Sequence, residues 1–139
     1  MKGVGNNSWL RMWLVTIVLV HFVVLLLHGA AHSRLAIPLS AWQTAFVGLV
    51  ISLLPLIGAS LLWTRHSRAG ARLIALSMFA SLVFGLVNHF VLISPDHITV
   101  VPAHPWRYSF ILSAALLVVT ETIGMVLGVL ATQTWRRAS

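Results

Sequence analysis

The sequence contains no cysteine. This absence excludes disulfide bonds, thiolate zinc sites, cysteine-ligated iron–sulfur clusters and any dithiol redox cycle. Charged residues are also scarce, at 8% of the chain, whereas hydrophobic residues make up 59%. A soluble domain of this size could not bury so much apolar surface. Any metal chemistry must therefore use nitrogen and oxygen ligands, in a protein that resides in a membrane.

Four long apolar runs fill most of the chain. They extend over residues 10–32, 38–63, 71–93 and 107–132. Each is close to or above the ~20 residues that a bilayer-spanning helix needs. The runs are continuously apolar instead of alternating, which argues against transmembrane strands. The sequence predicts an all-α integral membrane protein with one transmembrane domain over residues 1–139. Its short connections favour an antiparallel four-helix bundle.

Basic residues are distributed unequally between the two sides of this predicted bundle. Only Arg34 and Arg107 lie on one side, and the other seven of the nine Lys and Arg residues lie on the side of the chain ends. The positive-inside rule then places both termini in the cytoplasm. We expect a bacterial-type inner membrane or a plasma membrane, with the lipid bilayer as the main partner. Topology and anionic lipid explain the net charge of +7, and no nucleic-acid binding is expected.

Two segments of the chain share the spacing of proline, tryptophan and phenylalanine. Residues 38–46 and 102–110 match at all three residue types, and the same offset aligns His32 with Asp96. This match predicts two repeated helical hairpins. The alternative is coincidence, because proline and tryptophan are common where helices meet the membrane interface.

Three histidines of the first apolar run share one helix face. His21, His28 and His32 are separated by seven and four residues, which at helical periodicity places them in one narrow stripe. Imidazoles facing acyl chains would be costly, so we expect the stripe to face the bundle interior or a wet cavity.

Further histidines are predicted near the outer membrane face, at the depth of His28 and His32. Asn88 and His89 lie about one turn from the end of the third run, at the depth of His28, and Asp96 and His97 follow in the longest loop. Imidazoles from different helices at one depth can hold a haem iron or a transition metal ion. Haem would use two of them, and a compact metal ion three or four. The predicted metal ligands are His28, His32, His89 and His97.

A simpler interpretation of these residues is also open. Interfacial histidines keep their polar tips wet without binding any ligand. Asp96 fits a residue that orients a metal-binding imidazole, but Ser-Pro-Asp also begins ordinary turns.

Glu121 is a second costly residue, near the middle of the fourth run and at a depth comparable with His21. A carboxyl group there must be neutral or paired, and a pairing with His21 would form a proton relay in a polar pocket that includes Asn88 and Asp96. Alternatively, Glu121 forms a structural hydrogen bond between helices.

Three functional hypotheses follow. The first is a membrane protein whose outer-face, histidine-lined pocket binds haem or a transition metal ion. The second is a small proton-coupled transporter, as a homodimer, that uses Glu121 and His21. The third is a non-catalytic subunit of a larger membrane complex. The chain has no nucleotide-binding loop or nucleophilic triad, and whether it is an enzyme stays open.

Overall fold

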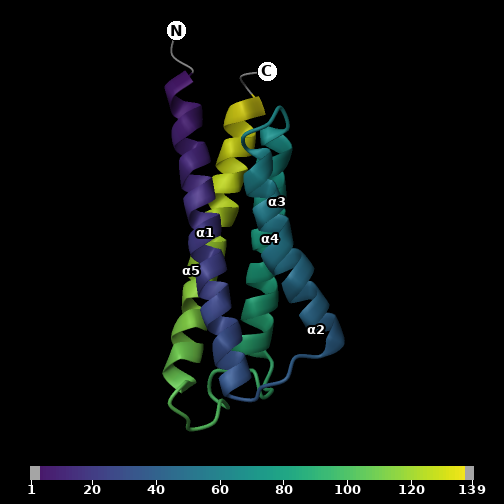
Figure 1. The fold of residues 1–139 in the computed structure, drawn as a ribbon, viewed down its shortest axis with the longest axis vertical. Helices are drawn as coiled ribbons and strands as arrows, with labels where there is room; N and C mark the ends of the chain where they lie inside the picture. Colours follow the sequence, from purple (N-terminus) through teal and green to yellow (C-terminus); the bar gives the residue numbers. More distant parts are fainter. Residues whose placement is uncertain (1–3, 137–139) are drawn as a thin grey trace.

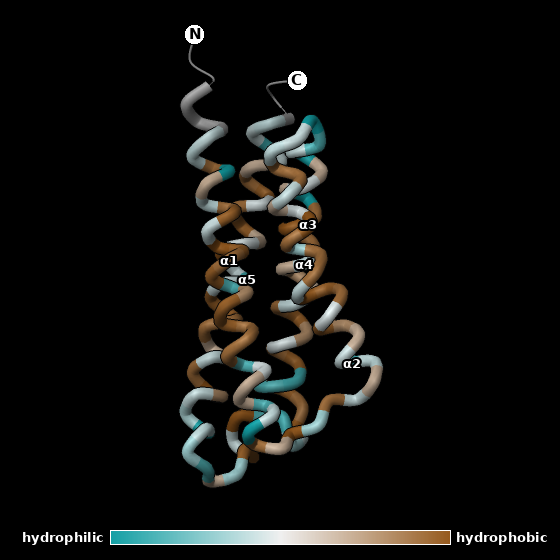
Figure 2. Tube along the Cα trace, in the orientation of Figure 1, coloured by the Kyte–Doolittle hydropathy of each residue, from teal (hydrophilic) through white to brown (hydrophobic). Residues whose placement is uncertain are grey.

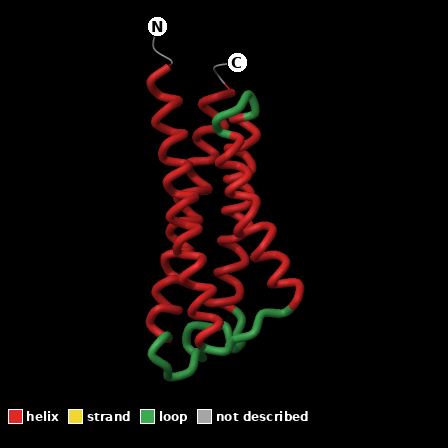
Figure 3. The backbone as a smooth tube through the Cα atoms, viewed as in Figure 1, coloured by secondary structure: helices red, strands yellow, loops and turns green. Residues whose placement is uncertain are grey.

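The computed structural model describes residues 4–136, with side chains described for residues 8–135. Every regular element in this range is helical, and no strand occurs in it (Figure 3). The elements are α1 (Val4–Arg34), α2 (Ala41–Phe46), η1 (Val47–Leu53), α3 (Leu54–Leu61), α4 (Ser67–Leu86), η2 (Val87–Val91) and α5 (Arg107–Arg136). The π-helical segments η1 and η2 continue directly from α-helices, so the seven elements form four rods.

All four rods are long and apolar enough to cross a membrane, which is compatible with the predicted membrane class. The candidate spans are Ser8–Arg34, Ala41–Leu61, Ser67–Val91 and Arg107–Trp135. Hydrophobic residues dominate the middle of the rods (Figure 2), and many of them point outward. An apolar outer surface is what lipid contact requires.

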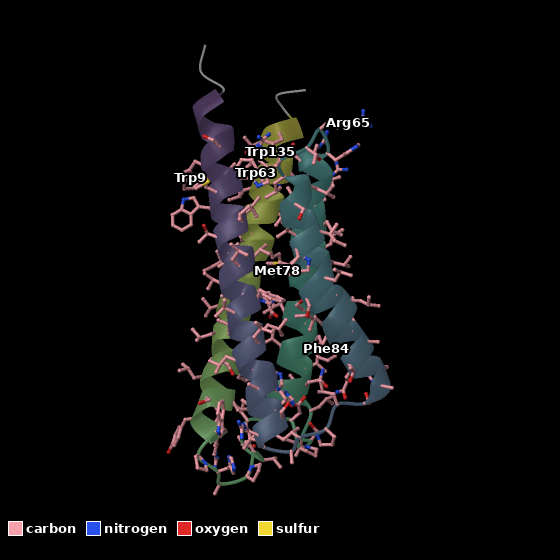
Figure 4. All side chains as sticks on the ribbon, in the orientation of Figure 1. Trp9, Trp63, Arg65, Met78, Phe84 and Trp135 are labelled. Atoms are coloured by element: carbon pink, nitrogen blue, oxygen red, sulfur yellow. The ribbon has the colours of Figure 1, made fainter. Side chains whose placement is uncertain are left out.

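The start of α1 and the end of α5 lie at the same end of the molecule (Figure 1). We call this the terminal end, and the opposite end, which carries residues 35–40 and 92–106, the histidine end. Trp9, Trp63, Arg65 and Trp135 all lie toward the terminal end (Figure 4). Tryptophan and arginine gather in this way at membrane interfaces.

The second rod begins later than residue 38 and is irregular. Ser40 is extended and caps α2, because its hydroxyl accepts from the Gln43 amide while the Gln43 side chain accepts from the Ser40 amide. This reciprocal capping box fixes the start at Ala41. Pro55 has no N–H to donate to the carbonyl of Ile51, and the π-helical segment η1 lies just before it. As Figure 1 shows, α2 leans away from the other rods at the histidine end.

The buried apolar residues form separate clusters along the bundle. The largest cluster, toward the terminal end, includes Leu14, Leu62, Ile74 and Met78, all fully buried. A second cluster closes the histidine end, where Phe110 packs with residues of α1 and of the 92–106 loop. Leu25, Ile51 and Leu117 form a third cluster, and all three border the cavity described below.

Candidate metal centre and its cavity

Three imidazoles from two rods converge near the histidine end. His28 and His32 come from α1 and His89 from η2, and none is more than 8% exposed. One nitrogen of each ring lies within 4.8 Å of the others. The closest approach is 3.2 Å, between Nε2 of His28 and Nε2 of His89. The histidine stripe of α1 therefore faces the interior, with His21 also buried.

The π-helical end of the third rod positions His89. The amide of Leu92 donates to the carbonyl of Val87, five residues back, and the chain then turns extended. Such π turns occur frequently at functional sites. The following loop returns to the helix, because the amide of Ile98 donates to the carbonyl of His89. Nδ1 of His89 lies 3.0 Å from the main-chain carbonyl of Asp96.

The end of α1 positions His32 in a similar way. Ala36 adopts a left-handed conformation with φ of 52°, and the amide of Ile37 donates to the carbonyl of His32. Reversal after a left-handed residue is a common way for a helix to end. It brings the carbonyl of Ile37 to 3.3 Å from Nδ1 of His32.

A serine of α5 holds the third ring. Nδ1 of His28 lies 2.9 Å from Oγ of Ser113. The Ser113 hydroxyl is itself 2.6 Å from the carbonyl of Ser109, which can only accept. The hydroxyl also lies 3.0 Å from the carbonyl of Phe110, so we assign its proton to these backbone carbonyls and the donor role to the His28 ring.

These outer partners assign the proton positions of all three rings. Carbonyl oxygens only accept, so Nδ1 of His32 and of His89 must carry a proton, as Nδ1 of His28 does. In neutral rings the three Nε2 atoms then carry no proton, and each presents a lone pair. Two of them face each other at 3.2 Å, acceptor against acceptor. Such a contact is repulsive unless a cation lies between the rings.

The Asp96 side chain adds a buried anion to this group. Its Oδ1 lies 3.1 Å from Nε2 of His32 and 3.6 Å from Nδ1 of His89. In the described part of the chain this oxygen nevertheless has no well-aligned hydrogen bond. A buried oxygen without a donor is unfavourable, and the nearest nitrogen to it is the unprotonated Nε2 of His32.

Phe110 forms an apolar wall against the whole cluster. Its ring centroid lies 4.8 Å from that of His28, 5.0 Å from that of His32 and 5.5 Å from that of His89. Because Phe110 is fully buried, its ring restricts how the imidazoles can rotate and keeps water from that side.

A cavity of about 700 Å³ extends from the cluster toward the middle of the bundle. It is lined by residues of α1, α2, η1, α4, η2 and α5. Its polar lining includes all three clustered imidazoles, Asp96 and Glu121. Of the predicted site residues, His28, His32, His89, Asp96 and Glu121 thus border one space, whereas His21, Asn88 and His97 do not line it.

The side chains of His21 and Glu121 have different neighbours. Nε2 of His21 lies 3.3 Å from the carbonyl of Ile51, the group that Pro55 leaves without its α-helical donor, and Nδ1 lies 3.4 Å from Oγ1 of Thr120. Glu121 is 2% exposed and its Oε2 has no partner among residues 8–135. Within that same range no hydrogen bond or ion pair joins His21 to Glu121.

Two other predicted site residues lie outside the group. His97 is buried, but its Nδ1 lies 2.8 Å from Oγ1 of Thr99 and it is absent from the convergent set. Asn88 accepts from the Gln43 side chain and donates to the carbonyl of Phe84, and so ties α2 to the third rod.

Sequence reasoning missed Ser113 and Phe110, although a signal was present. Phe110, Ser113 and Glu121 are separated by three and eight residues, so they share a face of α5 and predict an inward stripe. The arrangement as a whole can hold a cation with nitrogen and oxygen donors beside a roomy cavity. No protein-family model, curated protein or solved structure matches the chain.

Proposed function

We propose that this chain is a membrane protein that binds one transition metal ion through Nε2 of His28, His32 and His89, with Asp96 as a fourth ligand or charge partner. The observation that carries the proposal is the convergence of three buried imidazoles, each of which has its Nδ1 within hydrogen-bond distance of a carbonyl or hydroxyl oxygen. Metal-binding histidines characteristically have their other nitrogen fixed by a carbonyl or hydroxyl in this way.

The distances favour a single ion over haem. With metal–nitrogen bonds of ~2.0–2.1 Å, neighbouring ligands of a tetrahedral ion are about 3.3 Å apart, whereas opposite haem ligands are about 4 Å apart. The His28 and His89 nitrogens, at 3.2 Å, match the tetrahedral edge. A porphyrin would also have to fit between two rings already in contact.

The donor set favours zinc or copper(II). Imidazole nitrogens suit both ions, and a carboxylate oxygen can complete four ligands. Asp96 lies near enough to do so after a small rotation, since its Oδ1 is already 3.1 Å from Nε2 of His32. If Asp96 stays in the outer layer, the fourth position faces the cavity.

The proposed setting is an antiparallel four-helix bundle made of two repeated hairpins. The repeat aligns His32 with Asp96, and Nε2 of His32 lies 3.1 Å from Oδ1 of Asp96 at the site. The excess of basic residues at the terminal end supports cytoplasmic termini, and in this proposal the metal ion lies toward the outer face of a bacterial-type inner or plasma membrane.

Metal analysis of the protein purified in mild detergent tests the proposal. We expect near-stoichiometric zinc or copper in the wild type, and affinity at least about 100-fold weaker in His28→Ala, His32→Ala and His89→Ala, since each loses a direct ligand. Exposed His66 and His104 provide matched controls, whose alanine variants retain the metal. A metal-free wild type that also fails to bind added zinc and copper contradicts the proposal, and a Soret band would replace the single ion with haem.

One observation supports a proton-coupled transporter as a second candidate. Glu121 is buried, lacks a partner within residues 8–135 and borders the cavity, as a proton-exchanging carboxyl would. Transport that is lost in Glu121→Gln while the protein still folds would favour this function. His21 is not required for it, because His21 is bonded elsewhere.

A further inference from the structure

The cavity beside the metal site is large compared with an ion. Its volume of about 700 Å³ falls within the ~300–1,000 Å³ range of small-molecule sites. Most of its wall is apolar, with contributions from Leu25 and Leu26 of α1, Phe84 of α4 and Leu117 of α5. A hydrated ion gains nothing from such walls, whereas an apolar molecule does.

The cavity opens between α1 and the second rod, where exposed Ala36 and Pro38 of the connecting segment also border it. Leu26, Gly29 and Ser33 of α1 and Thr44 of α2 all border it and are all exposed. A Cβ atom built on Gly29 would have no neighbour within 4 Å. The opening coincides with the place where α2 leans away from the bundle (Figure 1). The four exposed residues of α1 and α2 lie within the candidate membrane spans, so we expect the opening to be accessible to a molecule dissolved in the bilayer.

The deep part of the cavity presents hydrogen-bond acceptors. Glu121 Oε2 is buried without a partner among the described side chains, and it faces Gly85, where a Cβ atom would lie 3.9 Å from it. The hydroxyls of Ser52 and Ser81 also border the cavity, but each donates to a carbonyl of its own rod, at 2.8 Å. Their oxygens therefore remain as acceptors, and a carboxyl group can accept in either protonation state.

We infer that this cavity binds a membrane-dissolved molecule with an apolar body and a hydroxyl head, which enters between α1 and α2–η1 and donates a hydrogen bond to Glu121. A hydroxyl supplies the missing donor without the cost of bringing a charged ammonium into the bilayer. Sterols, quinols and long-chain alcohols share this chemistry. The inference goes beyond the proposed metal site and does not require it, because Glu121 lies two helical turns along α5 from the serine that holds His28.

Photolabelling of the protein in lipid nanodiscs tests this inference. The probe is a medium-chain alkanol that carries a diazirine, and its comparison is the same diazirine alkane without the hydroxyl. Labelled residues are mapped by mass spectrometry. We expect the alkanol to label cavity residues such as Leu26, Phe84 and Glu121, and the alkane to label them at least about fivefold less, which is the effect of one hydrogen bond.

Two glycines provide a matched pair of variants. Gly29→Leu places a side chain in the cavity mouth, where we expect labelling to fall at least about fivefold. Gly48→Leu adds the same side chain at a position that also has open space but does not border the cavity, and labelling should persist. Glu121→Leu should remove the preference for the alkanol over the alkane.

The two proposals can fail independently. His28→Ala should lose the metal and keep the labelling, whereas Glu121→Leu should keep the metal. Competition by an unlabelled quinol, sterol or fatty alcohol identifies which hydroxyl lipid binds best. Labelling spread evenly over lipid-facing residues, or equal labelling in the Gly29→Leu and Gly48→Leu variants, would overturn the inference.

Discussion

The glycines of the two halves of the bundle have opposite surroundings. Toward the terminal end, a Cβ atom on Gly70 would lie 2.5 Å from the carbonyl of Gly58, and one on Gly128 would lie 2.8 Å from the carbonyl of Ala71. Toward the histidine end, a Cβ atom on Gly29 or Gly48 would meet nothing within 4 Å. The same residue type thus permits close helix contact in one half and leaves space in the other.

This difference gives the two halves of the bundle different roles in stability and in binding. Lipid chains are as apolar as leucine, so membrane helices associate through close packing instead of the hydrophobic effect, and small residues permit it. The terminal half has this packing, around a dry core of Leu14, Leu62 and Met78. The histidine half is therefore free to carry buried polar groups and a cavity, because the other half holds the rods together.

The largest expected effect comes from filling the close contact. Gly70→Val should destabilise the protein by about 3 kcal/mol or more, because the added Cβ atom alone would collide with the carbonyl of Gly58 in α3. Gly29→Val, which adds the same atoms in open space, should change stability by no more than about 1 kcal/mol, the helix-propensity difference. Thermal unfolding in detergent, followed by circular dichroism, measures both. Equal destabilisation would show that the two halves do not differ in packing.

The class of fold could be predicted from the sequence, because long apolar runs have only one arrangement that satisfies every backbone group in lipid. The inward direction of His21, His28 and His32 was predictable for a related reason, since helical periodicity fixes a shared face and lipid excludes imidazole from the other. These inferences needed only local spacing and the cost of burial.

The remaining features depend on contacts between distant segments. His97 was predicted as a ligand from its place in the loop, but a short Thr99 contact orients its ring elsewhere. His21 and Glu121 were predicted as a pair from depth alone. Depth says nothing about rotation around a helix axis, and it is Thr120, one residue earlier, that faces His21. Ser113 matters only because α5 packs beside α1.

A moderate effect is expected from the residue that fixes the His28 ring. Ser113→Ala removes the acceptor for Nδ1 of His28, so the ring can rotate or take the other tautomer, and metal affinity should fall about 10–100-fold. Titration with zinc, with a competing chelator, measures the change. Thr122→Ala, an exposed hydroxyl on the same helix that donates only to its own backbone, should leave the affinity unchanged. If Ser113→Ala bound metal with wild-type affinity, the contact with Ser113 would not be what fixes the His28 tautomer for metal binding.

The smallest effect concerns the middle of the bundle, where the two halves meet. His21 joins α1 to α5 through Thr120 and to η1 through the carbonyl of Ile51, to which Pro55 has no N–H to donate. A double-mutant cycle of His21→Phe and Thr120→Val should give a coupling energy of about 0.6 kcal/mol, the average for hydrogen bonds between membrane helices. The matched cycle of His21→Phe and Glu121→Gln should give a coupling near zero, because the two side chains are not bonded. Unfolding free energies in mixed detergent and denaturant provide both values. A larger coupling for Glu121 than for Thr120 would restore the proton relay, and with it a continuous polar path from the middle of the membrane to the histidine cluster.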